Sequence, residues 1–282
     1  MSKYYFDKES SHRAISFIER FCTHTKGELT KKPFLLEDWQ KEIVGNIFGW
    51  KDKKTNLRKY RTVFIAVPRK NGKTTLCAAI SLYMLFADSE RGSEVYAAAG
   101  DRNQAGIIFE IAKGMILQSS ELTSRSKVFR NSITHEAKGN FFQAISSDSK
   151  TKHGFNANCI IFDELHVQKN RDLWDALTTS TGARREPLTI AITTAGYDRQ
   201  SICYEVYNYA KLGVSLRVEY MERESKRAMD LPSYQNTFKR LMLNIWTESQ
   251  TKWIGHEEWM ECHQEFDYST LDGMECVGGL DL

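Results

Sequence analysis

The sequence predicts an α/β fold, with a mainly parallel central sheet flanked by helices and a small helical subdomain after it. Two observations support this prediction. Several short runs are rich in apolar and β-branched residues without polar alternation, as expected for strands buried on both faces of a parallel sheet. Helical patterns lie between several of these runs, and such alternation forms βαβ units with right-handed crossovers. The predicted strands are 62–67, 94–99, 140–145, 158–162 and 188–193.

The composition is that of an ordinary globular chain, with 282 residues of which 41% are hydrophobic and 27% are charged. It excludes a mainly disordered chain, a collagen-like fibre and a disulfide-stapled miniprotein. The formal charge is only +3, so a nucleic-acid partner would have to be bound by local basic clusters. No stretch approaches the ~20 apolar residues that span a bilayer, and we expect no membrane partner.

Cysteine usage indicates a reducing compartment. The 6 cysteines are spread along the chain without a CxxC pair, and several lie in apolar runs where a thiol packs as a small hydrophobe. We therefore expect a cytoplasmic location. His256, Cys262, His263 and Cys276 are close in sequence, but their spacing matches no usual zinc pattern. We favour packing or surface roles for these four residues.

The remaining elements follow from periodicity. Ala14, Phe17, Ile18 and Phe21 recur at helical spacing, so residues 8–50 are predicted to be mainly helical, with a break around 25–33. A basic stretch follows at 51–61, and we favour a solvated surface segment there. Beyond about residue 200 the strand patterns fade, and a charged stretch lies at 219–227. The predicted later helices are 74–86, 103–117, 171–179, 201–212, 237–245 and 255–266.

A phosphate-binding motif follows the first predicted strand. Gly72, Lys73 and Thr74 match the end of the P-loop template G-x-x-x-x-G-K-[ST], whereas Val67 stands at its first glycine. Gly72 allows the backbone to approach a phosphate closely, and the amides that begin the next helix favour an anion. Lys73 would contact the β- and γ-phosphates of ATP, and Thr74 would hold Mg²⁺. The alternative is an exposed basic turn between a strand and a helix.

Two carboxylates, Asp163 and Glu164, end the apolar run at 158–162. On its own this pair is equally compatible with a strand that leaves into solvent. Downstream of a P-loop, both motifs lie at the same edge of a parallel sheet. Asp163 would then bind Mg²⁺, and Glu164 would polarise the water that attacks the γ-phosphate. Further strands lie between the two motifs, which is typical of translocating ATPases and helicases rather than of small kinases or GTPases.

Taken in order, these motifs resemble those of the large terminase subunit of tailed bacteriophages. In that family the P-loop commonly lacks its first glycine and contains an arginine. The joint order over residues 34–282 is more specific than any single motif. The similar segments are the adenine-reading segment at 36–40, the altered P-loop at 68–75, the acidic motif at 160–166, the coupling motif at 192–196, the lid and linker at 243–247 with Trp253 and Trp259, and the first nuclease strand at 277–282.

The resemblance implies a P-loop NTPase that uses ATP and Mg²⁺ to drive viral double-stranded DNA into a procapsid. It implies partnership with the portal protein and the small terminase subunit, a homo-oligomeric ring on the capsid, and the cytoplasm of a bacterial host. Four parts are expected. They are an N-terminal helical segment with the adenine-recognition motif (1–60), the ATPase core (61–200), the lid and linker subdomain (201–276), and the first strand of a truncated RNase H-like nuclease domain (277–282).

The resemblance also assigns site residues. Arg69 would respond to the γ-phosphate and act with Lys73 and Glu164 in catalysis, and Gln40 would contact the adenine. Gln40 is otherwise a helix-surface amide, and Arg69 an exposed turn cation. The full set expected to bind ATP is Gln40, Pro68, Arg69, Lys70, Asn71, Gly72, Lys73, Thr74 and Thr75.

Thr193, Thr194, Ala195 and Gly196 would couple hydrolysis to rotation of the lid, unless the two threonines are ordinary strand-end residues. Asp281 looks like the first carboxylate of a two-metal nuclease site. One carboxylate cannot hold two ions, so we expect no nuclease activity from this chain.

A neighbouring subunit would supply an arginine finger, for which several cations are candidates. DNA contacts are open between the run at 51–61 and two groups of loop cations. The finger candidates are Arg102, Arg130, Arg184 and Arg185, with Lys150 and Lys152 as substitutes. The DNA candidates are Lys51, Lys53, Lys54, Arg58, Lys59 and Arg61, then Arg125, Lys127 and Arg130, then Lys150 and Lys152.

Two other functions compete with the motor. A P-loop helicase or translocase of another family would need a second sheet domain after residue 200, where no strand series is predicted. A non-hydrolysing adaptor that binds DNA or the capsid would have no need of Lys73, Thr74, Asp163 and Glu164 together.

Overall fold

The computed structural model describes residues 3–146, 154–168, 171–194 and 201–207, together with parts of the segment 225–247. Several features predicted above therefore lie outside the described residues. They are Lys150, Lys152, Ala195, Gly196, most of the stretch 219–227, Trp253, Trp259, the helix at 255–266, the group from His256 to Cys276, and the strand at 277–282 with Asp281.

Within the described residues, a seven-stranded sheet has the order β3-β9-β8-β4-β7-β6-β5. The first five strands in this order run parallel, and the last two add an antiparallel edge. The mainly parallel sheet predicted from the sequence is confirmed. The strands are β3 (Thr62–Ala66), β9 (Leu188–Thr193), β8 (Ala157–Asp163), β4 (Glu94–Ala99), β7 (Asn140–Ser146), β6 (Ser132–His135) and β5 (Lys127–Val128).

Burial explains why these strands were recognisable. Every residue of β8 and β9 is buried, which is the reason that neither strand shows polar alternation. The predicted bounds of β4 and β9 match the structure, and those of the other three predicted strands differ by one residue at one or both ends. Strands β5 and β6 were not predicted from the sequence, nor was the two-stranded antiparallel sheet of β1 (Tyr4–Phe6) and β2 (Trp50–Asp52). Strands of two to four residues are too short to show a period.

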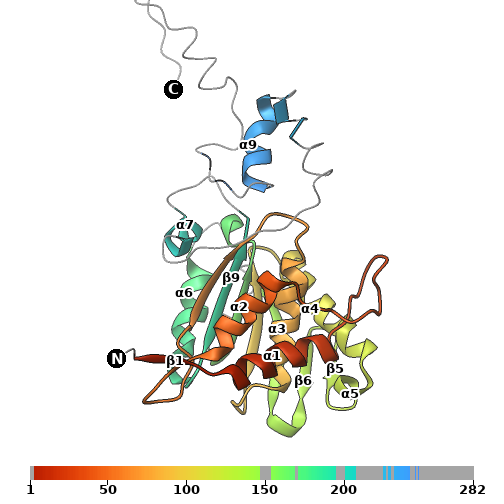
Figure 1. Ribbon diagram of the computed structural model, residues 1–282, viewed down its shortest axis with the longest axis vertical. Helices are drawn as coiled ribbons and strands as arrows, with labels where there is room; N and C mark the ends of the chain where they lie inside the picture. Colours follow the sequence, from red (N-terminus) through yellow and green to blue (C-terminus); the bar gives the residue numbers. More distant parts are fainter. Residues whose placement is uncertain are drawn as a thin grey trace, which may run out of the picture.

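Four helices cover one face of the sheet (Figure 1). They are α1 (Lys8–Phe21), α2 (Asp38–Gly49), α3 (Lys73–Phe86) and α4 (Arg102–Gln118), and the short α5 (Ser120–Thr123) follows α4. Residues 76–86 of α3 are all buried, because the sheet lies on one side of α3 and α1 and α4 pack on others. The α1 and α2 side chains share this core, so the N-terminal segment packs as part of the sheet domain.

A second apolar cluster covers the opposite face, where α6 (Asp172–Thr179) and α7 (Ile202–Tyr207) pack. The domain therefore has three layers. Helix α9 (Pro232–Leu241) lies beyond one end of the sheet (Figure 1). The prediction that this helix starts at 237 was wrong, because Pro232 suits the first helical position, where no amide hydrogen bond is needed. Among the described helices, none combines the length and apolar character needed to cross a membrane.

The register brings the ends of three strands to one edge. Ala66 of β3 pairs with Thr193 of β9, and Ile192 pairs with Asp163 of β8. The P-loop, the acidic pair and the end of β9 therefore leave the sheet side by side. Strand β9 lies between the P-loop strand β3 and the acidic strand β8, although it follows both of them in the chain. Such an edge is where α/β sheets bind ligands.

The basic stretch at 51–61 is partly structural, so the expectation of a solvated segment was wrong for three of its cations. Arg58 is 6% exposed, its Nη1 lies 2.7 Å from Asp88 Oδ1, and its Nη2 donates to the carbonyl of Glu186. Lys51 forms an ion pair with the carboxylate that caps α1, and Lys59 lies over three aromatic rings. The exposed cations of the stretch are Lys53, Lys54 and Arg61.

Candidate active site

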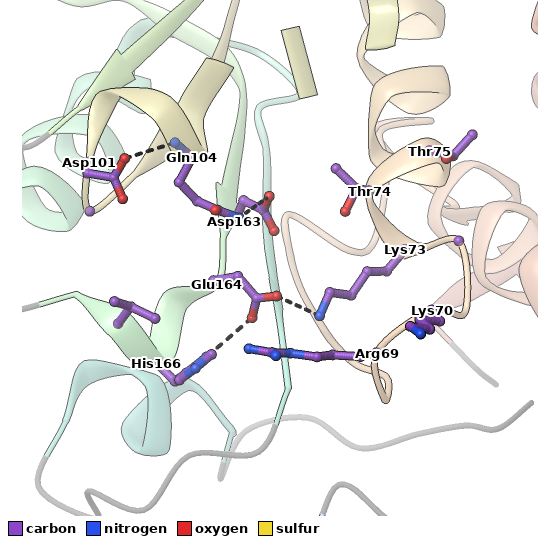
Figure 2. A pocket seen from close by; sticks show the side chains of 13 residues that line it. Arg69, Lys70, Lys73, Thr74, Thr75, Asp101, Gln104, Asp163, Glu164 and His166 are labelled. Carbon is purple, nitrogen blue, oxygen red and sulfur yellow. Dashed lines mark hydrogen bonds and ion pairs between the residues drawn. The ribbon is translucent and has the colours of Figure 1, made fainter. Parts of the chain in front are cut away.

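A pocket of about 460 Å³ lies at the carboxyl edge of the parallel strands (Figure 2). Its walls come from three places in the chain: the P-loop, the turn between β4 and α4, and the turn after β8. The P-loop supplies Arg69, Lys70, Gly72, Lys73, Thr74 and Thr75. The other two walls are Gly100, Asp101 and Gln104, and Asp163, Glu164, His166 and Val167. Most of the residues expected to bind ATP are thus brought together.

Left-handed backbone shapes the P-loop. Gly72 precedes α3 with φ +71°, a conformation that favours glycine. Lys70 has φ +68°, which is uncommon for a residue with a side chain. Asn71 is buried, and its side-chain amide donates to the carbonyls of Pro68 and Arg69 at 3.0 and 3.3 Å. The structure therefore places Asn71 in the fold of the loop itself, and neither Asn71 nor Pro68 lines the pocket.

Gln40 lies beside the P-loop but not in the pocket wall. It is buried in the first turn of α2, and its Oε1 accepts a hydrogen bond from the Glu37 amide at 3.0 Å. Its Nε2 approaches Gly72, since a Cβ built on that glycine would lie 3.5 Å from Nε2. Gln40 is thus no surface amide. Its contact with adenine stays a prediction.

An ion pair joins the two motifs across the pocket. Lys73 Nζ lies 2.7 Å from Glu164 Oε1, and both side chains are largely buried (Figure 2). Glu164 adopts φ +49° directly after β8. That turn carries the carboxylate back over the pocket toward the P-loop, and it is the kind of backbone strain that is stored at functional sites.

Asp163 is 1% exposed, and its Oδ2 accepts a hydrogen bond from Gln104 Nε2 at 3.1 Å. Its Oδ1 is buried without a hydrogen-bond partner. Burial, followed by the charge of Glu164, raises the pKa of Asp163 to about 6. A buried, unpartnered carboxylate oxygen is costly unless a cation or a donor satisfies it. With the Thr74 hydroxyl in the same pocket, these residues fit Mg²⁺.

The small number of protein ligands at this site is compatible with Mg²⁺. Among the described residues, no group of three or more His, Cys, Asp or Glu side chains could hold a metal ion by itself. Mg²⁺ usually binds through one or two protein ligands and completes its shell with water and substrate phosphates. A site of Thr74 and Asp163 is of this kind.

Three polar side chains of the pocket, those of Asp101, Gln104 and His166, were not predicted from the sequence. Asp101 caps α4 by accepting the amides of Asn103 and Gln104 at 2.8 and 2.9 Å, and this cap orients Gln104 toward Asp163 (Figure 2). His166 lies in the turn η2 (Leu165–Val167), 3.3 Å from Glu164 Oε2. An N-cap residue after a predicted strand was the available signal for Asp101. The position of Gln104 depends on β4 lying beside β8.

The two threonines of the coupling segment lie behind the pocket. Both are fully buried. Thr193 Oγ1 lies 2.7 Å from His166 Nδ1, donates to the Thr194 carbonyl at 2.9 Å and lies 4.0 Å from Cys203 Sγ. Thr193 is therefore connected to Glu164 through one side chain, and it is no ordinary strand-end residue.

The arginines differ in their freedom to act. Arg69 is exposed and points from the P-loop toward Glu164 and His166 (Figure 2). Arg184 donates to the carbonyls of Asn156 and Gly92 at 2.8 and 2.6 Å. These contacts hold Arg184 within its own chain and weaken it as an arginine finger. Arg130 is exposed in the turn between β5 and β6.

Comparison with known proteins decides the family. A family model described as "Terminase large subunit, ATPase domain" matches residues 38–212. The chain belongs to this family. Over 293 aligned residues it is 27% identical to the terminase large subunit of Enterobacteria phage HK97. The alignment covers 89% of this chain and 56% of that relative. It is 23% identical to the terminase large subunit of Lactococcus phage SK1 over 71% of this chain and 38% of the relative. The chain thus spans about half the HK97 relative and less of the other.

Solved terminase structures share the fold. The crystal structure of the HK97 large terminase has a TM-score of 0.71 at 24% identity, over 84% of this chain and 55% of that chain. The large terminase ATPase domain of Thermus phage P74-26 has a TM-score of 0.55 at 16% identity, over 68% of this chain and 91% of that chain. The P-loop fold of a terminase ATPase domain is therefore established, and a helicase of another family is set aside.

Proposed function

We propose that this chain is the ATP-hydrolysing motor part of a large terminase subunit, which drives viral double-stranded DNA into a procapsid. One observation carries the proposal. In a terminase ATPase fold, Lys73, Thr74, Asp163 and Glu164 come from two separate motifs and line one pocket. This set can bind a nucleoside triphosphate, hold Mg²⁺ and activate water. A non-hydrolysing adaptor would not need it.

The residues divide the work by charge. Lys73 would bind the β- and γ-phosphates, because it is the buried cation of the P-loop. Thr74 and Asp163 would hold Mg²⁺, which neutralises charge on the phosphates. Glu164 would accept a proton from the attacking water, a role in which a positioned carboxylate contributes about 10²–10⁴-fold to rate. Arg69 would stabilise the γ-phosphate, since it points into the same pocket.

The Lys73–Glu164 ion pair bears on when hydrolysis occurs. While Lys73 is paired with Glu164 at 2.7 Å, the carboxylate is engaged by a cation and is not free to act on water. Phosphate oxygens compete for the same cation, so binding of ATP would release Glu164 to act on water. The ion pair would thereby tie the reactivity of the carboxylate to occupation of the P-loop.

The proposed partners are DNA, the portal protein with its procapsid, and the small terminase subunit. DNA would be gripped without reading sequence, for which contacts from Lys and Arg to phosphates suffice. The exposed cations Lys53, Lys54 and Arg61 are available for this. We propose a homo-oligomeric ring on the capsid in the cytoplasm of a bacterial host, with Thr193–Gly196 coupling hydrolysis to movement.

The test is phosphate release by the purified chain with ATP, in Mg²⁺ and then in excess EDTA. It is repeated with double-stranded DNA and empty procapsids carrying portal. We expect Mg²⁺-dependent turnover that rises when DNA and procapsids are added together. Binding of ATP without turnover under all these conditions would contradict the motor and support the adaptor.

A further inference from the structure

His166 places one ring nitrogen, Nδ1, close to two side-chain oxygen atoms. Its Nδ1 lies 2.7 Å from Thr193 Oγ1 and 3.3 Å from Glu164 Oε2. The side chain is largely buried in the turn that follows Glu164. None of the roles proposed above uses this residue.

The hydrogen bonds of Thr193 decide which ring nitrogen carries the proton. The Thr193 hydroxyl donates to the carbonyl of Thr194 at 2.9 Å, so its oxygen is left to accept. His166 must then donate from Nδ1, and its backbone amide also donates to the same oxygen at 3.4 Å. Burial, the largest influence, lowers the pKa of His166. A neutral imidazole has one N–H, and it lies at Nδ1.

Glu164 has a matching need for a donor. Its Oε1 is engaged by Lys73 at 2.7 Å, whereas its Oε2 is buried without a hydrogen-bond partner. An unsatisfied buried acceptor is costly, and more so when it is charged. His166 Nδ1 lies 3.3 Å from this oxygen, but its proton is directed to Thr193. The two acceptors therefore compete for one proton.

We infer that His166 is a positioning residue whose single Nδ1–H bonds either Glu164 or Thr193. A change in the charge contacts of the catalytic carboxylate therefore alters the hydrogen bonding at the end of β9. The inference rests on the proposed function of Glu164. When phosphates draw Lys73 away, Glu164 loses its cation and becomes the stronger acceptor. The His166 proton then turns to Glu164 Oε2, and Thr193 loses its donor. No covalent bond changes in this exchange.

The signal has a physical route beyond Thr193. Thr193 Oγ1 lies 4.0 Å from Cys203 Sγ in α7, and α7 packs against the turn that contains His166. Helix α7 therefore contacts both Thr193, through Cys203, and the turn that contains His166. The coupling segment and the helix that follows it would respond to one hydrogen bond.

The test compares two substitutions of His166 in the whole chain. His166→Leu removes the donor at similar size, whereas His166→Asn keeps an N–H donor near the δ position. Hydrogen exchange of residues 188–194 and 201–207 is followed by mass spectrometry on adding a non-hydrolysable ATP analogue with Mg²⁺. Steady-state ATPase kinetics give kcat and KM. His12→Leu, on the exposed face of α1, is the matched control.

We expect the wild type and His12→Leu to change exchange in both segments when the analogue binds. His166→Leu should bind the analogue within about threefold of wild type, lose that exchange response, and show kcat lowered about tenfold with KM unchanged, as for loss of one hydrogen bond to a charged group. His166→Asn should restore most of the response. If His166→Leu fails to fold, Thr193→Val removes the acceptor instead, and it should abolish the same response.

An exchange response as large as that of wild type in His166→Leu or Thr193→Val would overturn the inference. Failure of His166→Asn to restore the response would also overturn it. The outcome is separable from the proposed function. If His166→Leu keeps both its ATPase activity and the wild-type exchange response, the proposed motor function stands and His166 has no part in it. A wild type without turnover contradicts the motor, while the exchange data still decide whether His166 links the pocket to α7.

Discussion

Lys73 and Glu164 form an ion pair of 2.7 Å across the strand that separates their motifs, with side chains only 7% and 16% exposed. At this distance the two side chains are in close charge contact. The pair therefore gains mainly from Coulomb attraction in a partly desolvated site. Removing one partner leaves a buried charge behind, which costs more than removing both.

A double-mutant cycle tests this relationship. Lys73→Ala and Glu164→Gln should each destabilise the fold, and the double variant should be more stable than the sum predicts, with a coupling of about 1–3 kcal/mol. Urea unfolding measures it. The control is the more exposed pair Lys41–Glu19, at 3.3 Å, where coupling below about 1 kcal/mol is expected. Additive effects in the first cycle would show that the two charges do not support each other.

Gln104 should tune the affinity for Mg²⁺ through Asp163. Gln104→Leu removes the donor to Asp163 Oδ2 and leaves both carboxylate oxygens unpartnered. Loss of such a supporting contact typically lowers metal affinity about 10–100-fold. The Mg²⁺ concentration for half-maximal ATPase activity should rise accordingly. Gln118→Leu, at the far end of the same helix, is the control. If both variants need the same Mg²⁺ concentration for half-maximal activity, Gln104 does not support the metal site.

Arg58 should stabilise the fold instead of binding DNA. Arg58→Ala leaves Asp88 buried without its cation, and a loss of about 3–5 kcal/mol is expected in the free energy of unfolding. Arg61→Ala, from the exposed part of the same stretch, should change stability by less than about 0.5 kcal/mol. Chemical denaturation of the two variants measures the difference. Similar stabilities would mean that the Arg58–Asp88 contact is not formed in solution.

Asp7 combines a helix cap with an ion pair, and two substitutions separate them. Its carboxylate accepts the amides of Glu9 and Ser10, and it contacts Lys51 Nζ at 2.8 Å. Asp7→Asn keeps a good cap and should cost less than about 1 kcal/mol. Asp7→Ala loses both contacts. It should lower the free energy of unfolding by about 1–2 kcal/mol relative to wild type.

The pH dependence of Asp7 has a definite sign. Hydrogen bonds from Lys51 and Ser10 lower its pKa in the folded chain. The stabilisation is therefore complete above the unfolded pKa of about 4 and is lost as the pH falls through the lower, folded value. The difference in unfolding free energy between wild type and Asp7→Asn should be largest near neutral pH and shrink below about pH 4. A difference that grows on acidification would contradict the ion pair.

The parts of the fold that the sequence revealed are those whose cause is local. Strands β8 and β9 are buried on both faces, and their continuous apolar runs indicate this without knowledge of the neighbouring strands. Strands β1 and β2 pair across more than forty residues of chain and are three residues each. Their formation depends on tertiary contact, for which a short run holds no signal.

The same distinction applies to the site. Lys73 and Thr74 are neighbours in one motif, and Asp163 and Glu164 in another, so both could be recognised. The contact of Gln104 with Asp163 requires β4 to lie beside β8, and the contact of His166 with Thr193 requires β9 beside β8. Arg58 reads as a surface cation until its acidic partner is placed next to it. Sheet order is the information that the sequence pattern lacks.

The central claim is that Glu164 activates water in a pocket where Lys73 binds phosphate. Steady-state ATPase rates of wild type, Glu164→Gln and the exposed control Glu42→Gln test it most directly, together with ATP binding measured by fluorescence of a labelled analogue. We predict that Glu164→Gln lowers kcat by at least about 10²-fold while ATP still binds, and that Glu42→Gln matches wild type. Turnover by Glu164→Gln at the wild-type rate would contradict the account.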